Sequence, residues 1–215
     1  MATTYAELID ALEGCSKEAR EEELTLGEAF DRLGEASYSL ICIVLCLPFL
    51  QPISLGPLST LGGLTFAVLG WQLFRRQPSP WLPERVRRSA PSAGVWKRII
   101  GLLRGIVRFC GKFTRPRYTH LVSGAHGDRI VGGLIVVAGL LMAIPFFGIP
   151  FNNTLPALVI IAACIAELED DGLFVFVAFA LLAVTVLYFV LIFWVIFFAG
   201  GQALEFLNRW RGGLN

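Results

Sequence analysis

Apolar residues gather in five long runs along the chain. The runs cover residues 36–50, 61–74, 130–147, 155–166 and 173–199. An α-helix needs about 20 apolar residues to cross the hydrocarbon layer of a bilayer. The pattern therefore predicts that the last run crosses with residues to spare, that 130–147 just reaches across, and that the other three are too short on their own.

The short runs come in pairs that are broken by proline and glycine. The prolines are Pro48 and Pro52 in the first pair and Pro145 and Pro150 in the second. Helix breaks of this kind predict re-entrant hairpins, whose tips must be buried and polar-lined because non-helical backbone at membrane depth needs partners. Kinked helices joined by ordinary turns outside the membrane are the alternative interpretation.

The two hairpins look like copies of one unit. An Asp-Arg pair stands at the same distance before a Pro-Phe pair in both, and a Thr-Leu pair follows in both. The paired positions are Asp31-Arg32 with Asp128-Arg129, Pro48-Phe49 with Pro145-Phe146, and Thr60-Leu61 with Thr154-Leu155. We therefore expect two pseudo-symmetric repeats, a device typical of transporters with a binding site between the halves. The pattern favours an inverted repeat if 167–172 faces outward, but it leaves the topology open.

Composition indicates an integral membrane protein. Hydrophobic residues make up 55% of the 215 residues and charged residues 16%, against about 25% charged in an average soluble domain. The N-terminus lacks the basic stretch and apolar core of a signal peptide. The five cysteines form no CxxC pair, and the two histidines have no partner at ligand spacing. No metal site and no cofactor are therefore predicted.

Charge is distributed very unevenly. Between residues 75 and 117 stand twelve Lys or Arg residues and one acid, in a chain whose net charge is +1. The positive-inside rule makes this segment cytoplasmic. Within it, residues 95–113 predict an amphipathic helix that lies in the interface and attracts anionic lipid. Its basic stripe consists of Lys97, Arg104, Arg108, Lys112 and Arg115. Nucleic acid is not an expected partner so close to membrane segments.

The predicted fold is an all-α integral membrane protein in five parts. The parts are acidic membrane-peripheral helices (1–35), a first membrane hairpin (36–77), a basic loop with the amphipathic helix (78–122), a second hairpin (123–172), and a transmembrane helix with its tail (173–215). In the first part, the pairs Thr4 with Glu7 and Thr25 with Glu28 read as capping boxes and predict two short helices.

Polar residues in and beside the hairpins are the candidate substrate site. They are Asp31, Arg32, Gln51, Thr60, Asp128, Arg129, Asn152, Asn153, Thr154 and Glu167. Pseudo-symmetry would bring the two arginines together on an anionic headgroup, while interfacial anchoring is the alternative. The amides and hydroxyls of the hairpin tips either close the hairpins or line a path, because they are costly at bilayer depth without partners. Glu167 is either an interfacial cap or a functional acid.

Four segments carry a family likeness. They are LTLGEAFDRLGEASYSLICIVLCLPFLQPI, GPLSTLGGLTFAVLGWQL, PWLPERVRR and IPFFGIPFNNTLPALVIIAACIAELEDDG. Their order and spacing resemble the ExoD family of bacterial exopolysaccharide-synthesis proteins, over most of the chain. The resemblance implies a multi-pass protein of the bacterial inner membrane that is needed for exopolysaccharide production. It supplies no catalytic motif whose residues could be carried over.

Three function classes remain. The first is a transporter or flippase of an anionic substrate such as a polyprenyl-phosphate carrier, and the second is an ion or proton transporter that depends on Glu167. The third is an assembly factor that holds polysaccharide-synthesis proteins at the membrane. An enzyme is the least expected class, because no nucleophile, base and orienter arrangement appears. A homodimer stays open, since Gly62-Gly63 and Gly132-Gly133 would serve packing within one chain equally well.

Overall fold

The computed structural model describes residue 14 and residues 25–34, 36–52, 55–81, 83–111, 114–115, 117–146 and 148–212; within these, the side chains of 93, 107, 109, 110 and 199–212 are not described. The helices are α2 (Leu26–Leu33), α3 (Ala36–Cys46), η1 (Leu47–Leu50), α4 (Pro57–Phe74), α5 (Glu84–Arg87), α6 (Ala93–Cys110), η2 (Thr119–Leu121), α7 (Gly124–Ala143), α8 (Thr154–Leu168) and α9 (Gly172–Gly212). Over the described ranges the chain forms no strand, which confirms the all-α prediction. The predicted helix that follows Thr4 lies outside the described residues.

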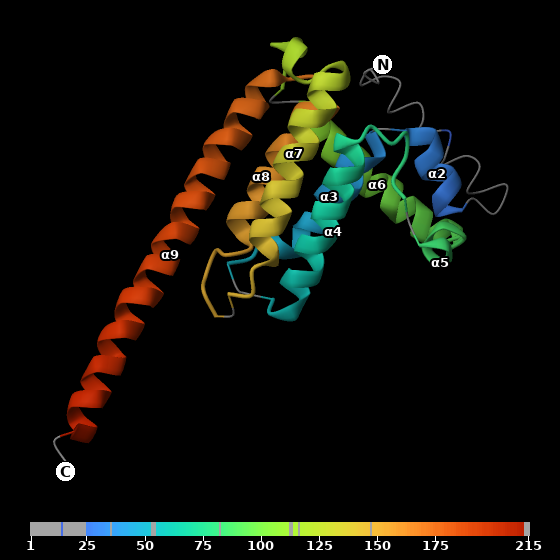
Figure 1. Ribbon diagram of the computed structural model, residues 1–215. Helices are drawn as coiled ribbons and strands as arrows, with labels where there is room; N and C mark the ends of the chain where they lie inside the picture. Colours follow the sequence, from blue (N-terminus) through green and yellow to red (C-terminus); the bar gives the residue numbers. More distant parts are fainter. Residues whose placement is uncertain are drawn as a thin grey trace.

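Two helical pairs, α3 with α4 and α7 with α8, correspond to the two predicted hairpins. Helix α7 and the segment Gly172–Phe198 of α9 are long and apolar enough to cross a membrane, whereas Ala36–Leu50 and Thr154–Leu168 are shorter apolar helices. The lengths predicted for four of the five apolar runs are therefore confirmed, whereas the run 61–74 lies in a longer helix, α4, of 18 residues. The turns of the two pairs lie at the same end of the molecule (Figure 1), so both pairs point in the same direction.

Proline chemistry explains where the helices stop. Pro48 opens the short η1 helix directly after α3. Helix α7 ends before Pro145, and Ile144 has the extended backbone (ψ 122°) that a following proline favours. Pro57 starts α4, a position where its missing N–H costs nothing. The breaks expected at the hairpin turns are thus present as helix ends.

Glycines set the closest helix contact of the bundle, that between α4 and α7. A Cβ at Gly63 would lie 2.5 Å from the carbonyl oxygen of Gly139, and one at Gly70 would lie 2.8 Å from that of Gly132. The pairs run in opposite order along the two helices, which are therefore antiparallel neighbours. Small residues let backbones approach closely in membrane helices, and here they do so within one chain.

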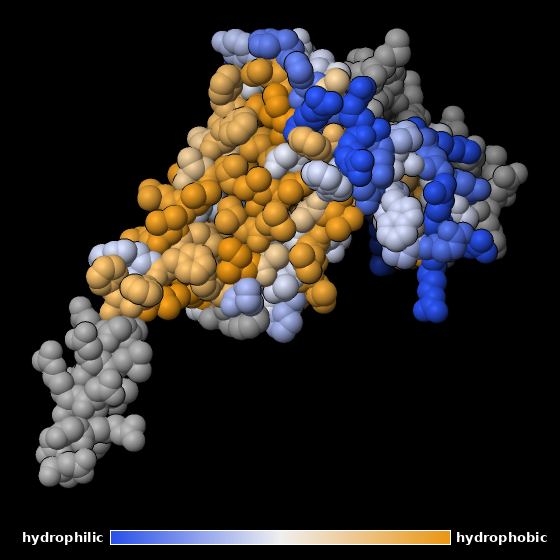
Figure 2. Space-filling model, in the orientation of Figure 1, coloured by the Kyte–Doolittle hydropathy of each residue, from blue (hydrophilic) through white to orange (hydrophobic). Residues whose placement is uncertain are grey.

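Helix α9 covers α8 and then continues past the bundle (Figure 1). At 41 residues it is about 60 Å long. Its buried side chains, including Val175, Ala178 and Phe189, face the bundle, while aromatic residues towards Phe198 are exposed. Figure 2 shows an apolar surface over α7, α8 and α9 and a hydrophilic surface on the side of α2 and α5.

The amphipathic helix is present as α6, with two corrections. It ends at Cys110, so Arg115 lies beyond it, while Lys112 falls outside the described residues. Its buried side chains Trp96, Ile100 and Leu103 belong to the main apolar core and line a hollow together with α2 and α3. The apolar face of α6 therefore packs on the protein instead of lying only against lipid.

Candidate functional site

Three arginines surround a pocket at the end of α4. The pocket has a volume of about 380 Å³ and is lined by Arg75, Arg76, Arg129, Trp71 and Phe74. The α4–α7 glycine contacts bring Arg129 of α7 beside the last turn of α4. The rings of Trp71 and Phe74 stack at 5.5 Å between centroids, and the Arg75 guanidinium lies 5.9 Å from the Trp71 ring. One wall of the pocket is therefore aromatic and the other is cationic.

A buried carboxylate fixes one of these arginines. The Nε of Arg76 donates to Oδ2 of Asp128 over 2.9 Å, and the Asp128 side chain is only 8% exposed while that of Arg76 is 50% exposed. Three arginines line the pocket and one of them is paired with a carboxylate, so the pocket stays positively charged. Planar guanidinium groups match the geometry of phosphate and carboxylate oxygens. The pocket is therefore suited to an anion.

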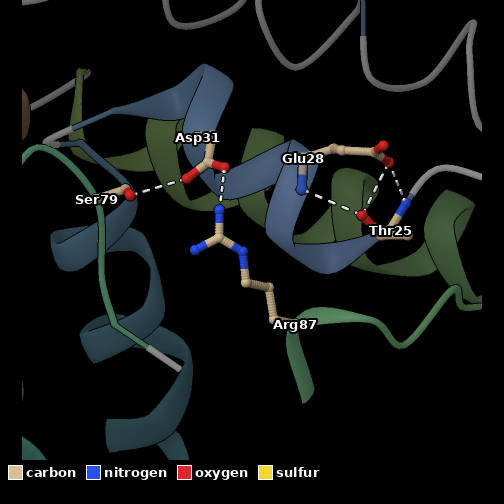
Figure 3. A network of polar contacts seen from close by, with 5 residues as sticks. All are labelled: Thr25, Glu28, Asp31, Ser79 and Arg87. Atoms are coloured by element: carbon tan, nitrogen blue, oxygen red, sulfur yellow. Dashed lines mark hydrogen bonds and ion pairs between the residues drawn. The ribbon is translucent and has the colours of Figure 1, made fainter. Parts of the chain in front are cut away.

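Asp31 of the first Asp-Arg pair lies in a different polar network, shown in Figure 3. Asp31 accepts a hydrogen bond of 2.7 Å from Nη2 of Arg87 and one of 2.8 Å from the hydroxyl of Ser79. In both halves, then, the aspartate binds an arginine of the basic segment. Arg32 is exposed on α2 and is not among the residues that line the arginine pocket.

Figure 3 also shows the capping box that starts α2. The backbone N–H of Glu28 donates to Oγ1 of Thr25 over 3.2 Å, and the Glu28 carboxylate accepts from the backbone N–H of Thr25 over 2.9 Å. The hydrogen bonds that the Thr25 backbone N–H and the Thr25 hydroxyl donate to the Glu28 carboxylate hold the pKa of Glu28 below its usual range. The capping box predicted at Thr25 is confirmed.

The two hairpin tips are joined by hydrogen bonds. Asn153 donates from Nδ2 to Oγ of Ser59 over 2.7 Å, and the Thr154 hydroxyl donates to the Gln51 carbonyl over 2.9 Å. Four predicted tip residues therefore lie in one place: Gln51, Asn152, Asn153 and Thr154. Thr60 is half-buried in the first turn of α4, and its neighbour Ser59 makes the contact across the hairpins instead.

Two amide oxygens at these tips have no hydrogen-bond partner in the described part of the chain. They are Oδ1 of Asn152 and Oδ1 of Asn153, and the two side chains are 3% and 0% exposed. The amino group of Asn152 is held by the Phe146 carbonyl at 2.8 Å, which fixes the side-chain orientation. A buried acceptor without a donor is costly, so the tip is ready to accept hydrogen bonds from a hydroxyl group or water.

Glu167 lies at the opposite end of α8 from the tips. Its Oε2 accepts a short hydrogen bond from the Ser39 hydroxyl, between α3 and α8. Asn153 and Glu167 flank nearly the whole of α8, which at 15 residues is about 22 Å long. The predicted site residues thus fall into separate groups: the arginine pocket, the Asp31 network, the tips and the Glu167 contact.

The turn between α8 and α9 concentrates acidic side chains. Oε2 of Glu169 accepts from the Thr114 hydroxyl over 3.1 Å, and Asp171 accepts from the backbone N–H of Leu173 over 3.0 Å, which caps α9. Burial raises the pKa of Glu169, nearby Asp170 and Asp171 add to this, and Thr114 opposes it. Burial also raises the pKa of Asp170. No group of His, Cys, Asp and Glu among the described residues is arranged to hold a metal ion.

The raised pKa of Glu169 predicts a pH-dependent stability effect. A carboxyl group whose folded pKa lies above its unfolded value of about 4.3 contributes stability below that value and loses it as the pH rises through the folded pKa. We expect Glu169→Gln to raise the free energy of unfolding at pH 8 by less than about 1 kcal/mol, because the group is half exposed. The melting temperature therefore rises at pH 8 and stays unchanged near pH 4.

Thermal unfolding of the detergent-purified protein at both pH values measures this. Glu28→Gln serves as a control of opposite sign, because the pKa of Glu28 is lowered and its carboxylate stabilises the folded state at neutral pH. A Glu169→Gln variant that melts below the wild type at pH 8 would contradict the expectation.

Sequence reasoning missed Arg75 and Arg76 as site residues. The charge pattern identifies them only as the first two residues of the basic segment 75–117. The available signal was their position directly after an apolar run that ends in Trp71 and Phe74, since cations beside aromatic residues are typical of a membrane interface.

Comparison with known proteins assigns the chain to a family. The family described as "Exopolysaccharide synthesis, ExoD" matches residues 8–191. The chain is 31% identical to Protein ExoD of Rhizobium meliloti (strain 1021), over 92% of this chain and 82% of that protein. It is also 26% identical to an uncharacterized protein of Synechocystis sp., over 90% of each chain. No solved structure matches the chain significantly. With the family match covering most of its length, this protein is a member of the ExoD family, whose role is in exopolysaccharide synthesis.

Proposed function

We propose that the protein binds an anionic lipid-linked substrate, with a phosphate in the arginine pocket, and moves it across the membrane as a transporter or flippase. A polyprenyl-phosphate carrier is the substrate class that fits a role in exopolysaccharide synthesis. The observation that carries the proposal is the pocket of Arg75, Arg76 and Arg129 beside two stacked aromatic rings.

The pocket has the chemistry of a headgroup site at a membrane surface. Aromatic residues such as Trp71, which is exposed, gather where the bilayer meets water. Arginine forms paired hydrogen bonds with phosphate oxygens, and the buried Asp128 holds Arg76 in place before a ligand arrives. The basic segment that begins at Arg75 favours a cytoplasmic pocket in the bacterial inner membrane.

Helix packing supports two related repeats. The first helix of each hairpin packs on the second helix of the other, α3 on α8 and α7 on α4. A twofold relation between the hairpins accounts for this exchange of partners. Because both tips lie at the same end, the arrangement favours parallel repeats, related by an axis along the membrane normal, over inverted ones.

The depth of the tips supports re-entrant hairpins. The Tyr188 hydroxyl donates to the Pro150 carbonyl, and Phe146 packs on Phe189 and Phe193. The tips are therefore level with the middle of the apolar segment Gly172–Phe198. From Phe189 to Phe198 that segment continues for about another 14 Å at 1.5 Å per residue. A depth of this kind supports a position of Asn152 and Asn153 inside the membrane, along the proposed path of a substrate headgroup.

A liposome assay tests the proposal. Purified protein is reconstituted, and binding and movement of a polyprenyl phosphate are measured for wild type, Arg75→Ala and Arg129→Ala. Loss of one charge-assisted contact with phosphate weakens binding by about tenfold or more. Arg88→Ala is the matched control, because Arg88 is 79% exposed and pairs with Glu84 outside the pocket. Equal binding by all three variants, or none by wild type, would remove the support for a lipid carrier.

The acidic end of α8 favours a second candidate, a proton transporter. Glu167 lies between α3 and α8 in contact with Ser39, and Glu169 close behind has a raised pKa. In this function Glu167→Gln abolishes proton movement into vesicles while Arg129→Ala leaves it intact. If the protein is a lipid carrier, Arg129→Ala weakens polyprenyl-phosphate binding and Glu167→Gln leaves it intact. The same two variants therefore distinguish the two candidate functions.

A further inference from the structure

A hollow of about 220 Å³ lies between α2, α3 and α6. Every side chain that lines it is apolar, among them Ala29 and Phe30 of α2, Val44 of α3, and Trp96 and Ile99 of α6. It is separate from the arginine pocket, which α4 and α7 form with the residues between them.

A second hollow of about 260 Å³ lies between α3, η1 and α4, and Leu45 lines both hollows. At Gly62, a Cβ would lie 2.4 Å from the Phe49 ring, so the glycine leaves space for that ring. Because the two largely apolar hollows share Leu45, they adjoin along α3, and together they are called the groove.

Hydrocarbon is the occupant that suits this groove. A purely apolar cavity of about 150 Å³ stays dry and binds small hydrocarbons, because water finds no polar partner in it. An empty groove would leave its walls without dispersion contacts on one side. Leu45, which lines the groove, is 40% exposed, so the groove is open to the surface and a hydrocarbon chain can enter it.

Cationic side chains border the groove on α6. Lys97 and Arg98 are exposed on this helix, between the lining residues Trp96 and Ile99 in the sequence. Each basic residue near a membrane surface attracts anionic lipid, and a basic amphipathic helix concentrates that attraction. Charge complementarity therefore points to an occupant that joins a hydrocarbon chain to an anionic headgroup.

We infer that this groove holds an acyl chain of an anionic phospholipid, whose headgroup lies against Lys97 and Arg98 of α6. The bound lipid packs α2 and α6 onto α3. This site is independent of the proposed transport function, because it uses other helices and a lipid that stays bound.

The test measures lipid that remains with the full-length protein. Protein from vesicles of equal phosphatidylglycerol and phosphatidylcholine is purified in mild detergent, and retained lipid is quantified by extraction and native mass spectrometry. We expect retained phosphatidylglycerol in excess over phosphatidylcholine. Val44→Trp, which fills the groove, lowers retention at least tenfold, and Val68→Trp on the exposed face of α4 leaves it unchanged.

A second variant covers the case in which Val44→Trp fails to fold. The double substitution Lys97→Glu and Arg98→Glu changes only exposed side chains. Each basic residue raises the affinity for anionic lipid about fivefold, so we expect the double variant to retain at least tenfold less lipid. Equal retention of both phospholipids, or full retention by both the Val44→Trp and the charge-reversal variants, overturns the proposal. Wild-type protein that retains no phospholipid also overturns the proposal, and this is the result expected if residues 1–24 occupy the groove instead. Displacement of phosphatidylglycerol by an equimolar amount of polyprenyl phosphate overturns it as well. Arg129→Ala keeps the phospholipid, so failure of the transport function is distinguishable.

Discussion

Gly139→Leu is expected to prevent α4 and α7 from packing and to leave little folded protein in the membrane. Any Cβ at Gly139 would lie 2.7 Å from the Ala67 nitrogen and from the Gly63 oxygen. Both are backbone atoms, so the contact is relieved only when the helices move apart. Overpacking by side chains alone costs about 1–3 kcal/mol, and separating two helices loses further contacts along their length. Fluorescence-detected size-exclusion chromatography of solubilised membranes measures the loss.

Two adjacent glycines of α7 provide a matched comparison. A Cβ at Gly132 would lie 2.6 Å from the Phe74 nitrogen, whereas one at Gly133 meets only the Phe74 ring at 4.0 Å. Both alanine substitutions gain about 1 kcal/mol of helix propensity. We expect Gly133→Ala to keep or raise the melting temperature and Gly132→Ala to lower it. Equal melting of the two variants would show that α4 and α7 are not packed as described.

Asn153→Leu is expected to cost about 1–3 kcal/mol of stability and to stop exopolysaccharide production in cells. The substitution removes the buried hydrogen bond to Ser59 that joins the two hairpins and also one of the two unpartnered oxygens. Chemical denaturation in detergent measures the stability change. A complementation assay in a strain that lacks the protein measures the production of polysaccharide.

Ser59→Ala separates the two roles of Asn153. It removes the same hydrogen bond but keeps the amide of Asn153. A double-mutant cycle with Asn153→Leu therefore gives the contribution of the Ser59–Asn153 interaction to the free energy of unfolding. We expect Ser59→Ala to be destabilising yet to retain production, because the acceptor oxygen at the tip remains. If well-folded Asn153→Leu protein still supports production, the tips line no substrate path and an assembly role becomes the better account.

Local sequence features anticipated the helices well. The apolar runs became helices, the prolines became helix ends, and Thr25 with Glu28 formed the capping box. Each of these features depends on interactions within a few residues along the chain, so it can be predicted from sequence without knowing which helices pack together.

Which helices pack on each other could not be predicted from the sequence in the same way. Helices α4 and α7 have apolar residues on all sides, so no stripe marks the face that meets the other helix. Gly63 and Gly132 carry the contact through the absence of a side chain, and the sequence alone showed them only as members of two glycine pairs without a partner. The arginine pocket depends on that same contact, which is why Arg129 was expected beside Arg32 and not beside Arg75 and Arg76.

Helix α8 and the apolar part of α9 do not fit one thickness of membrane. The 15 residues of α8 extend about 22 Å and the 27 residues of Gly172–Phe198 about 40 Å, against hydrocarbon of about 30 Å. Tilting accommodates the long helix, whereas a re-entrant α8 needs no match to the membrane thickness, because its hairpin turns back before it reaches the far side. A headgroup that follows the hairpins to their tips therefore has only the remaining part of the hydrocarbon layer to cross.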